Sequence, residues 1–310
     1  MLAHATAAQD LEIGSFAPTQ GAAQPSRRLV LATYNIRYGV GAWMIATALL
    51  RKLGAPIAQP RGDVVTRNLR QAARAFSGQR KFPAPDINAL QEADNATARS
   101  GGVHVARELA RELSWHYAHA PNRPPRTQPQ EQKQWYLDFE EIIAPIDTGV
   151  TGVALLSRFP LARAARIDLP WTDCPWRPRL ALGASWRLGD NSLQVFNSHI
   201  DPHAPLAEQL AQHETILAQA ERAAGPVVLL GDFNTLTPRA RRETRRFLEA
   251  RGYLTPIPDG TATWRAGAFT NHTDWIFARG ARLTRWGVAR GLRQVSDHWP
   301  VWVEIELPQL

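Results

Sequence analysis

Cysteine is almost absent from this 310-residue chain, which contains only Cys174. A single cysteine excludes a disulfide within the chain and a metal site built from several thiolates. A catalytic thiol would need a neighbouring base and a polar pocket, and we interpret Cys174, between Asp173 and Pro175, as incidental. We therefore expect no disulfide partner, and this composition fits a reducing compartment.

Long apolar runs are also lacking. No stretch of about 18 or more apolar residues occurs, so we expect no transmembrane segment. The N-terminus has no basic segment followed by an apolar run, so we expect no signal peptide and a cytoplasmic protein. Residues 1–28 are rich in Ala, Gln, Pro and Thr without sustained periodicity. We interpret them as an N-terminal tail or loose segment before one domain at residues 29–310.

The chain has fewer acidic than basic residues, and its formal net charge at pH 7 is +8. A basic surface suits an anionic partner such as nucleic acid, phospholipid headgroups or a phosphorylated small molecule. The alternative is that arginines cover solvated helix faces, and those between residues 239 and 246 do recur at helical spacing. Charge therefore favours an anionic partner without identifying it.

One strongly apolar stretch, from Pro226 to Gly231, is followed directly by Asp232-Phe233-Asn234. Such a run of Val and Leu between Pro and Gly predicts a buried strand. Asp232 and Asn234 are two residues apart and so point to the same side. A carboxylate can take a proton from water, and an amide can hold that water or a phosphate oxygen. A turn that closes the strand is the structural alternative.

The remaining pattern mixes strand–helix units with strand–strand hairpins. Strands are predicted at residues 29–34, 86–91, 152–157, 180–188, 193–198, 274–278 and 299–307, and helices at 43–53, 63–76, 101–113, 205–222 and 238–250. Asp63 is the expected cap of the second helix, and residues 120–134 are expected to form a long exposed loop. This order predicts an α/β protein with mixed sheets.

Polar residues stand at or beside the ends of most of these strands. They are Asn35, Glu92, His199, Asp232, Asn234, Asp274, Asp297 and His298. Ends of neighbouring strands meet in open α/β folds, so we expect one site. A carboxylate-rich set without thiolates favours Mg²⁺ or Mn²⁺ over zinc and suits phosphate-ester hydrolysis. Taken singly, each residue also has a structural explanation as a turn, a cap or a hydrogen-bonded core side chain.

Six motifs, in this order, resemble the endonuclease/exonuclease/phosphatase superfamily. They are T-Y-N-I-R at residues 33–37, I-N-A-L-Q-E at 87–92, N-S-H at 197–199, L-G-D-F-N at 230–234, T-D-W-I at 273–276 and S-D-H-W-P-V at 296–301. The resemblance implies a four-layered α/β sandwich with two mixed β-sheets packed face to face and helices outside. It also implies a metal-dependent hydrolase that cleaves phosphoric ester bonds with an in-line water.

The resemblance further implies a Mg²⁺ site, for which Mn²⁺ is a substitute. Glu92 would be the main metal ligand, and Asn35 would help to hold the metal or the phosphate. Asp297 would lie beside the metal. Loss of the Glu92 carboxylate charge is therefore expected to abolish most activity.

The same resemblance assigns catalytic roles to the other five residues. Asp232 and Asn234 would orient and deprotonate the attacking water, and His199 would donate to a phosphate oxygen. Asp274 would hydrogen-bond His298 and favour its imidazolium form, so that His298 contacts the scissile phosphate. Whether Asp232 or the His298–Asp274 pair is the base stays open.

The expected partner is an anionic phosphate-ester substrate, with nucleic acid as the leading candidate. The sequence of residues 197–203 differs from that of the abasic-site endonucleases of the superfamily. With a histidine at position 199, it is more similar to the secreted nuclease, sphingomyelinase, deadenylase and inositol-phosphatase branches. The Trp- and Arg-bearing segment 171–179 would stack a base and hold a phosphate, or else pack in the core. A lipid-headgroup or small-molecule phosphodiesterase is the alternative, and a catalytically silent binding module is the rival from another class. The oligomeric state is not predicted.

Overall fold

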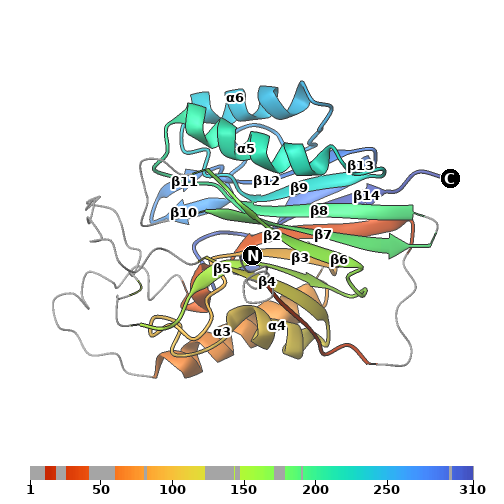
Figure 1. Ribbon diagram of the computed structural model, residues 1–310. Coiled ribbons are helices and arrows are strands. Elements are labelled where there is room, and N and C mark those ends of the chain that lie inside the picture. Colours follow the sequence, from red (N-terminus) through yellow and green to blue (C-terminus); the bar gives the residue numbers. More distant parts are fainter. Residues whose placement is uncertain are drawn as a thin grey trace, which may run out of the picture.

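The computed structural model describes residues 11–18, 26–41, 60–79, 82–122, 143, 147–170, 179–189, 191–292 and 295–309. Two β-sheets pack face to face, and helices cover their outer faces (Figure 1). This arrangement confirms the predicted four-layered α/β sandwich with two mixed sheets. The predicted helix at residues 43–53, Cys174 and most of the predicted loop at 120–134 lie outside the described residues.

The first sheet has, in the described part of the chain, seven strands in the order β1–β4–β5–β3–β2–β14–β13. In that order they span Glu12–Ser15, His116–Asn122, Thr151–Ser157, Ile87–Gln91, Arg28–Asn35, Val301–Glu306 and Arg282–Val288. Strands β2 and β3 are parallel, and the other neighbours are antiparallel. The helix α3 (Arg61–Phe76) lies between these two strands in the chain, because parallel neighbours need a long crossover.

The second sheet has five strands in the order β12–β9–β8–β7–β6, counted over the same residues. They span Asp274–Arg279, Val227–Asp232, Asn191–His199, Leu180–Leu188 and Arg163–Asp168. Here β8 and β9 form the parallel pair, joined through α5 (Leu206–Ala220). Each sheet therefore has one parallel pair with antiparallel strands beside it. A separate hairpin pairs β10 (Trp264–Ala266) with β11 (Phe269–Asn271).

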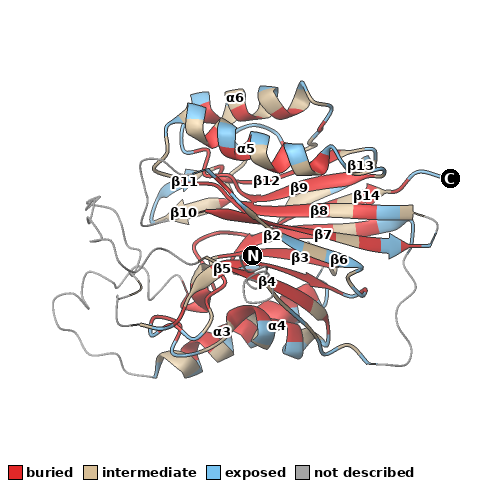
Figure 2. Ribbon diagram, viewed as in Figure 1, coloured by how far each residue is buried: buried red, intermediate tan, exposed pale blue. Residues whose placement is uncertain are grey.

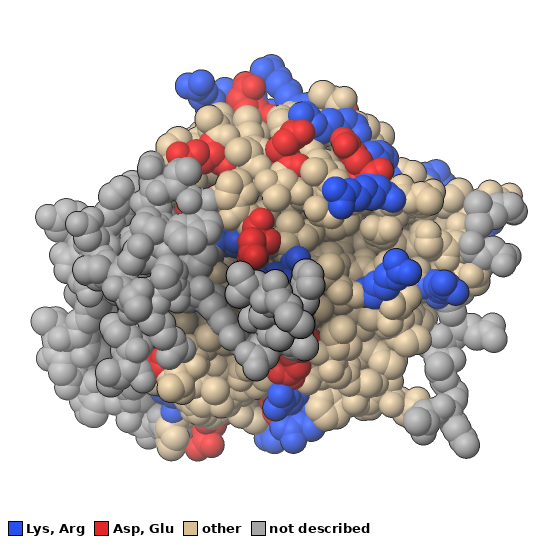
Figure 3. Space-filling model, in the orientation of Figure 1, with Lys and Arg blue, Asp and Glu red and all other residues tan. Residues whose placement is uncertain are grey.

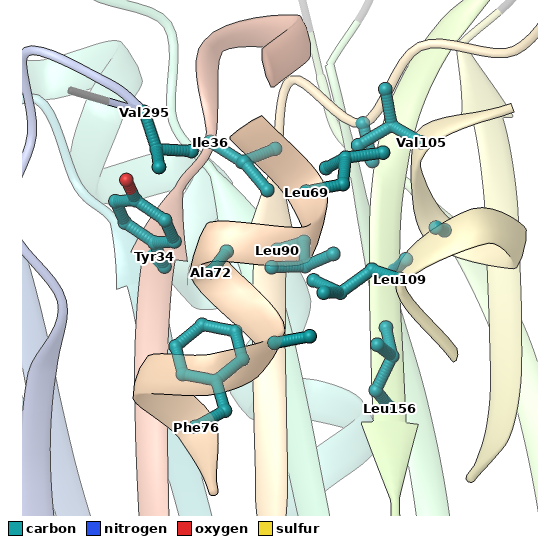
Figure 4. Packing of buried hydrophobic residues seen from close by; sticks show 14 of the residues in the cluster. Tyr34, Ile36, Leu69, Ala72, Phe76, Leu90, Val105, Leu109, Leu156 and Val295 are labelled. Atoms are coloured by element: carbon teal, nitrogen blue, oxygen red, sulfur yellow. The ribbon is translucent and has the colours of Figure 1, made fainter. Parts of the chain in front are cut away.

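Strands of the parallel pairs are apolar on both faces because both faces are covered. In β2, Leu29 and Leu31 face the other sheet, whereas Ala32 and Tyr34 belong to the core under α3 and α4 (Val105–Leu113). Figure 4 shows that outer core, where side chains from both helices meet those of the sheet.

The second sheet is covered in the same way by α5 and α6 (Pro238–Glu249) (Figure 2). Both helices bury one face and expose the other, as expected for amphipathic surface helices. No helix in the described ranges is long and apolar enough to cross a membrane.

Part of the predicted N-terminal tail is ordered structure. Strand β1, at Glu12–Ser15, pairs with β4 at the edge of the first sheet, so the prediction of a loose segment is wrong there. Strand β1 has only four residues, and every second one is exposed. Such a short stretch gives no periodic signal in the sequence. The rest of the boundary near residue 28 stays a prediction.

Three predicted boundaries also need correction. Pro60, not Asp63, is the N-cap of α3, and Asp63 lies in the first turn, where a carboxylate favours the helix dipole. Helix α4 begins at Val105 after the cap residue His104, four residues beyond the predicted start. The predicted loop at 120–134 begins inside β4, because His- and Pro-containing strands resemble loops in sequence.

Candidate active site

The topology brings the predicted residues to one edge of the sandwich. Strands β2 and β3 run in parallel, with Asn35 opposite Gln91. Asn35 therefore leaves the first sheet together with Glu92, the residue that follows Gln91. In the second sheet, His199 stands opposite Asp232 at the ends of β8 and β9. The carboxyl ends of the two parallel pairs, with Asn234 two residues beyond β9, therefore supply five of the eight predicted side chains.

The other predicted residues arrive from strand beginnings. Strand β12 runs antiparallel to β9, which places its first residue, Asp274, opposite Asp232. Strand β14 runs antiparallel to β2, so the turn before Val301, with Asp297 and His298, lies beside the end of β2. An antiparallel neighbour starts where its partner ends, and for this reason strand starts and strand ends meet here.

Asn35 links the carboxylates of the two sheets. Its Nδ2 atom donates to Glu92 Oε1 at 2.9 Å and to Asp232 Oδ2 at 3.0 Å. Two carboxylate oxygens thus lie within hydrogen-bond distance of one buried amide nitrogen. Carboxylate oxygens without thiolates are the donors that Mg²⁺ and Mn²⁺ prefer, so Glu92 and Asp232 fit such an ion. The Asn35 Oδ1 atom accepts a hydrogen bond from the backbone N–H of Arg37 at 3.0 Å.

Asp232 is buried, with 1 % of its surface exposed. Burial, reinforced by the charge of Asp274, raises the pKa of Asp232 to about 7, against the opposing effects of His298 and Asn35. The backbone N–H of Asn234 donates to Asp232 Oδ1 at 3.0 Å, and the Asn234 side-chain amide donates to the carbonyl of Ile200 at 2.8 Å. Asn234 is therefore held beside an aspartate that can change its protonation near neutral pH.

His298 forms an ion pair with Asp274. Its Nδ1 atom lies 2.9 Å from Asp274 Oδ2, and its Nε2 atom lies 3.8 Å from Asp232 Oδ2. Burial lowers the pKa of His298, but Asp274 and then Asp232 outweigh it and raise that pKa to about 10. The hydroxyl of Thr273 also donates to Asp274 Oδ2 at 2.8 Å.

Asp232, Asp274 and His298 also offer ligand atoms within 4.8 Å of one another, which is close enough for a metal. We interpret them instead as a charged histidine between two carboxylates. An imidazolium donates hydrogen bonds from both nitrogens and has no lone pair for a metal. The ion would then lie nearer Asn35 and Glu92.

Asp297 is held by residues that the sequence analysis did not assign to the site. Its Oδ2 atom forms an ion pair with Arg37 and accepts a hydrogen bond from Trp264 Nε1 at 2.9 Å. Burial raises the pKa of Asp297, but Arg37 and then His298 outweigh it and lower that pKa. Its assignment as a metal ligand stays a prediction, since the described contacts of its carboxylate are to protein groups.

His199 is the last residue of β8, paired with Asp232 at the end of β9. Its Nε2 atom is 3.7 Å from Asp232 Oδ2 and 4.0 Å from Glu92 Oε1. Arg179, which is also buried, places its NH1 atom 3.1 Å from His199 Nδ1. Arg179 was predicted only as part of the segment 171–179, of which residues 171–178 lie outside the described residues.

Left-handed backbone conformations cluster around this site. Four of the non-glycine residues with positive φ are Arg37 at 43°, Tyr38 at 44°, Glu92 at 53° and Asn234 at 48°. Such conformations are unfavourable for residues with a side chain and persist where surrounding contacts enforce them, as they often do at functional sites. The clustering supports a functional role for this edge of the sandwich.

Comparison with known proteins agrees with the geometry. The model of the Endonuclease/Exonuclease/phosphatase family matches residues 32–298. A curated protein, UPF0294 protein YE0917 of Yersinia enterocolitica, is 32% identical over 114 residues, which are 37% of this chain and 37% of that protein. The matched part thus spans little more than a third of that relative.

Solved structures share the fold at low sequence identity. An endonuclease/exonuclease/phosphatase from Beutenbergia cavernae DSM 12333 has a TM-score of 0.61 at 17% identity, covering 91% of this chain and 72% of that one. A mannosyl-6-phosphatase, Bt3783, from Bacteroides thetaiotaomicron VPI-5482 has a TM-score of 0.57 at 19% identity, covering 89% of this chain and 99% of that one. At these identities the likeness concerns the fold.

Proposed function

Because the chain belongs to the Endonuclease/Exonuclease/phosphatase family, we propose that it is a nuclease, which hydrolyses a phosphodiester by in-line attack of an activated water. The observation that carries this proposal is the position of the buried His298 between two buried carboxylates, with Nδ1 2.9 Å from Asp274 Oδ2 and Nε2 3.8 Å from Asp232 Oδ2. Asp232 has its pKa raised to about 7, and His298 has its pKa raised to about 10. One group is thus poised to accept a proton at neutral pH while the other keeps its charge.

In this proposal Asp232 takes the proton from the attacking water. Asn234, fixed through the carbonyl of Ile200, orients that water. His298 remains an imidazolium, held by Asp274, and donates to the scissile phosphate, whose oxygens gain charge in the transition state. The alternative, in which the His298–Asp274 pair is the base, would require His298 to lose its proton near neutral pH.

Glu92 and Asn35 would hold a divalent cation, Mg²⁺ or its substitute Mn²⁺, with Asp297 beside it. Such an ion, when bound, neutralises charge on the phosphate and on the attacking oxygen. Arg179 lies beside His199, with NH1 3.1 Å from Nδ1, and both side chains would donate to a non-bridging phosphate oxygen. Arg37, on the other side, keeps the Asp297 carboxylate in place.

The choice of a nuclease depends on the net charge of +8 and on the arginines at the site. Figure 3 shows that blue and red side chains are interspersed over α5 and α6, so the basic balance does not form a patch on that face. Ion pairs on α6, such as Arg245 with Glu249, account for part of this pattern. The alternative is a phosphate ester of a lipid headgroup or small molecule, for which the fold relative named as a mannosyl-6-phosphatase offers a precedent.

A substrate panel tests the proposal. Plasmid DNA, single-stranded DNA, RNA, sphingomyelin, a chromogenic diester and a sugar phosphate are incubated with Mg²⁺, with EDTA, and with the Glu92→Gln variant purified identically. We expect turnover of a nucleic acid that EDTA and Glu92→Gln both abolish, with a KM that rises steeply with salt. A best substrate that is small or lipid, with a KM insensitive to salt, would replace the nuclease by the alternative. No metal-dependent turnover in the panel would favour the silent binding module.

A further inference from the structure

A buried ion pair joins Arg99 to Asp94, which follows Glu92 by two residues in the chain. Arg99 donates from Nε to Asp94 Oδ2 at 2.7 Å and from NH2 to Asp94 Oδ1 at 2.9 Å. The hydroxyl of Thr97 donates to the same Asp94 Oδ2 atom at 2.6 Å. Asp94 is 0% and Arg99 5% exposed, so both charges have left water completely or nearly so.

This ion pair completes a closed set of contacts that begins and ends at Glu92. The Arg99 guanidinium lies over the ring of Tyr38, 4.1 Å from its centroid. The backbone N–H of Tyr38 in turn donates to the carbonyl of Glu92 at 2.9 Å. Because Asp94 follows Glu92 by two residues, the path from Glu92 through Asp94, Arg99 and Tyr38 returns to Glu92.

Stability alone is a weak reason for this arrangement. Removing two charges from water is unfavourable, and a buried pair often contributes no more than well-packed apolar residues would. What the pair does supply is fixed geometry, since a bidentate guanidinium stacked on a ring has little freedom. Within this closed set of contacts, Glu92 and Tyr38 have positive φ angles of 53° and 44° and therefore need such restraint.

Proceeding from the proposed function, we propose that Arg99, through Asp94 and Tyr38, is a positioning residue that sets the affinity of Glu92 for the divalent cation. Arg99 contacts neither the cation nor the substrate in this assignment. Mg²⁺ demands near-ideal octahedral geometry, so a small shift of one carboxylate weakens binding. Residues that orient metal ligands typically change metal affinity by about 10- to 100-fold when replaced.

The test is Arg99→Lys, which keeps the charge but loses the bidentate fork and most of the stacking on Tyr38. A second variant, Tyr38→Leu, removes the aromatic ring and leaves the ion pair whole, and it is compared with Tyr38→Phe, because the Tyr38 side chain also hydrogen-bonds Arg37. The matched control is Arg279→Lys, because Arg279 also lies over a tyrosine ring, 4.8 Å from the centroid of Tyr253. Arg279 ends β12, the strand that begins with Asp274, and is therefore remote from the site.

Mn²⁺ binding is measured by electron paramagnetic resonance without substrate, and thermal unfolding is followed in EDTA. We expect Arg99→Lys and Tyr38→Leu to raise the Mn²⁺ dissociation constant roughly tenfold or more, and Arg279→Lys to leave it unchanged. High Mg²⁺ should restore the kcat of Arg99→Lys, whereas it should not restore Glu92→Gln, which lacks the ligand itself.

Each other outcome overturns a specific statement. If a folded Arg99→Lys or Tyr38→Leu protein binds Mn²⁺ with wild-type affinity, the contacts among Asp94, Arg99 and Tyr38 are purely structural and the inference is refuted. If Arg99→Lys does not fold, Tyr38→Leu decides by the same measurement. Failure of the wild-type protein to bind Mn²⁺ at all refutes the metal site of the proposed function, and this inference with it.

Discussion

The charge on His298 can be tested through the pH dependence of stability, using Asp274→Asn. This substitution keeps the size of the side chain and removes the negative charge that lies 2.9 Å from His298 Nδ1. At that separation and an effective dielectric constant of about 20, the lost attraction is on the order of 5 kcal/mol. Since about 1.4 kcal/mol corresponds to one pKa unit, the pKa of His298 should fall by three to four units, roughly.

The sign follows from proton binding in the two states. In the folded wild type the pKa of His298 is raised from 6.5 to about 10, so the folded state binds the proton more tightly. The resulting stabilisation is complete below pH 6.5 and is lost as the pH rises toward 10. Asp232, whose pKa is raised from 3.8 to about 7, changes the free energy of unfolding mainly below pH 7. Between pH 7 and 9 His298 alone should therefore reduce the free energy of unfolding by about 2.5 kcal/mol.

Urea unfolding in EDTA at pH 7, 8 and 9 measures this slope. The wild-type protein should lose stability across the series, whereas Asp274→Asn should lose much less of it over the same range. Asp259→Asn serves as the control for background titration, since Asp259 pairs with Arg241 on α6 and lies at the surface. If the wild type and Asp274→Asn show parallel slopes, His298 is neutral in the folded state and its assignment as the charged donor is wrong.

Three further predictions concern activity and stability. Glu92→Gln should reduce kcat severely while its melting temperature in EDTA stays near that of the wild type. Asp232→Asn and His298→Ala should each lower kcat by on the order of 10² or more, and the double variant by less than the product, because both act on one transition state. Burial lowers the pKa of His213 from 6.5 to about 3, so stability should fall as the pH drops below 6.5. At pH 5, His213→Phe should therefore recover roughly 2 kcal/mol in urea unfolding.

Much of the fold could be predicted because its central strands are apolar on both faces. Strands β2 and β9 were predicted to within one residue at each end and β14 to within two, and the family implied by the six motifs is confirmed. Edge strands such as β1 and β6 were missed, since half of their side chains face solvent and apolar periodicity is weak there. The identity of the metal and the substrate stay predictions.

The convergence of the eight candidate residues could be predicted because each stands at or beside the end or the beginning of a strand, where backbone direction decides its position, whereas their roles stay predictions. Arg37 and Arg179 were not assigned to the site, although Arg37 lies within the first motif. A long side chain reaches its partner across several ångströms, so its target depends on tertiary packing rather than on strand periodicity. Arg37 meets Asp297, which is 260 residues away in the chain, and no local pattern predicts such a pair.

The position of the site at the junction of two sheets makes the packing between those sheets part of its chemistry. Gln91 and Asn197, both fully buried, join the sheets directly below the site through a hydrogen bond of 2.6 Å, and Gln91 also donates to Thr33. Gln91 precedes Glu92 on β3, and Asn197 lies two residues before His199 on β8. Apolar side chains alone would let two sheets slide with little penalty, whereas a buried amide pair loses its bond and leaves unsatisfied groups. We therefore expect this polar contact to restrain the two sheets where His199 Nε2 lies 4.0 Å from Glu92 Oε1.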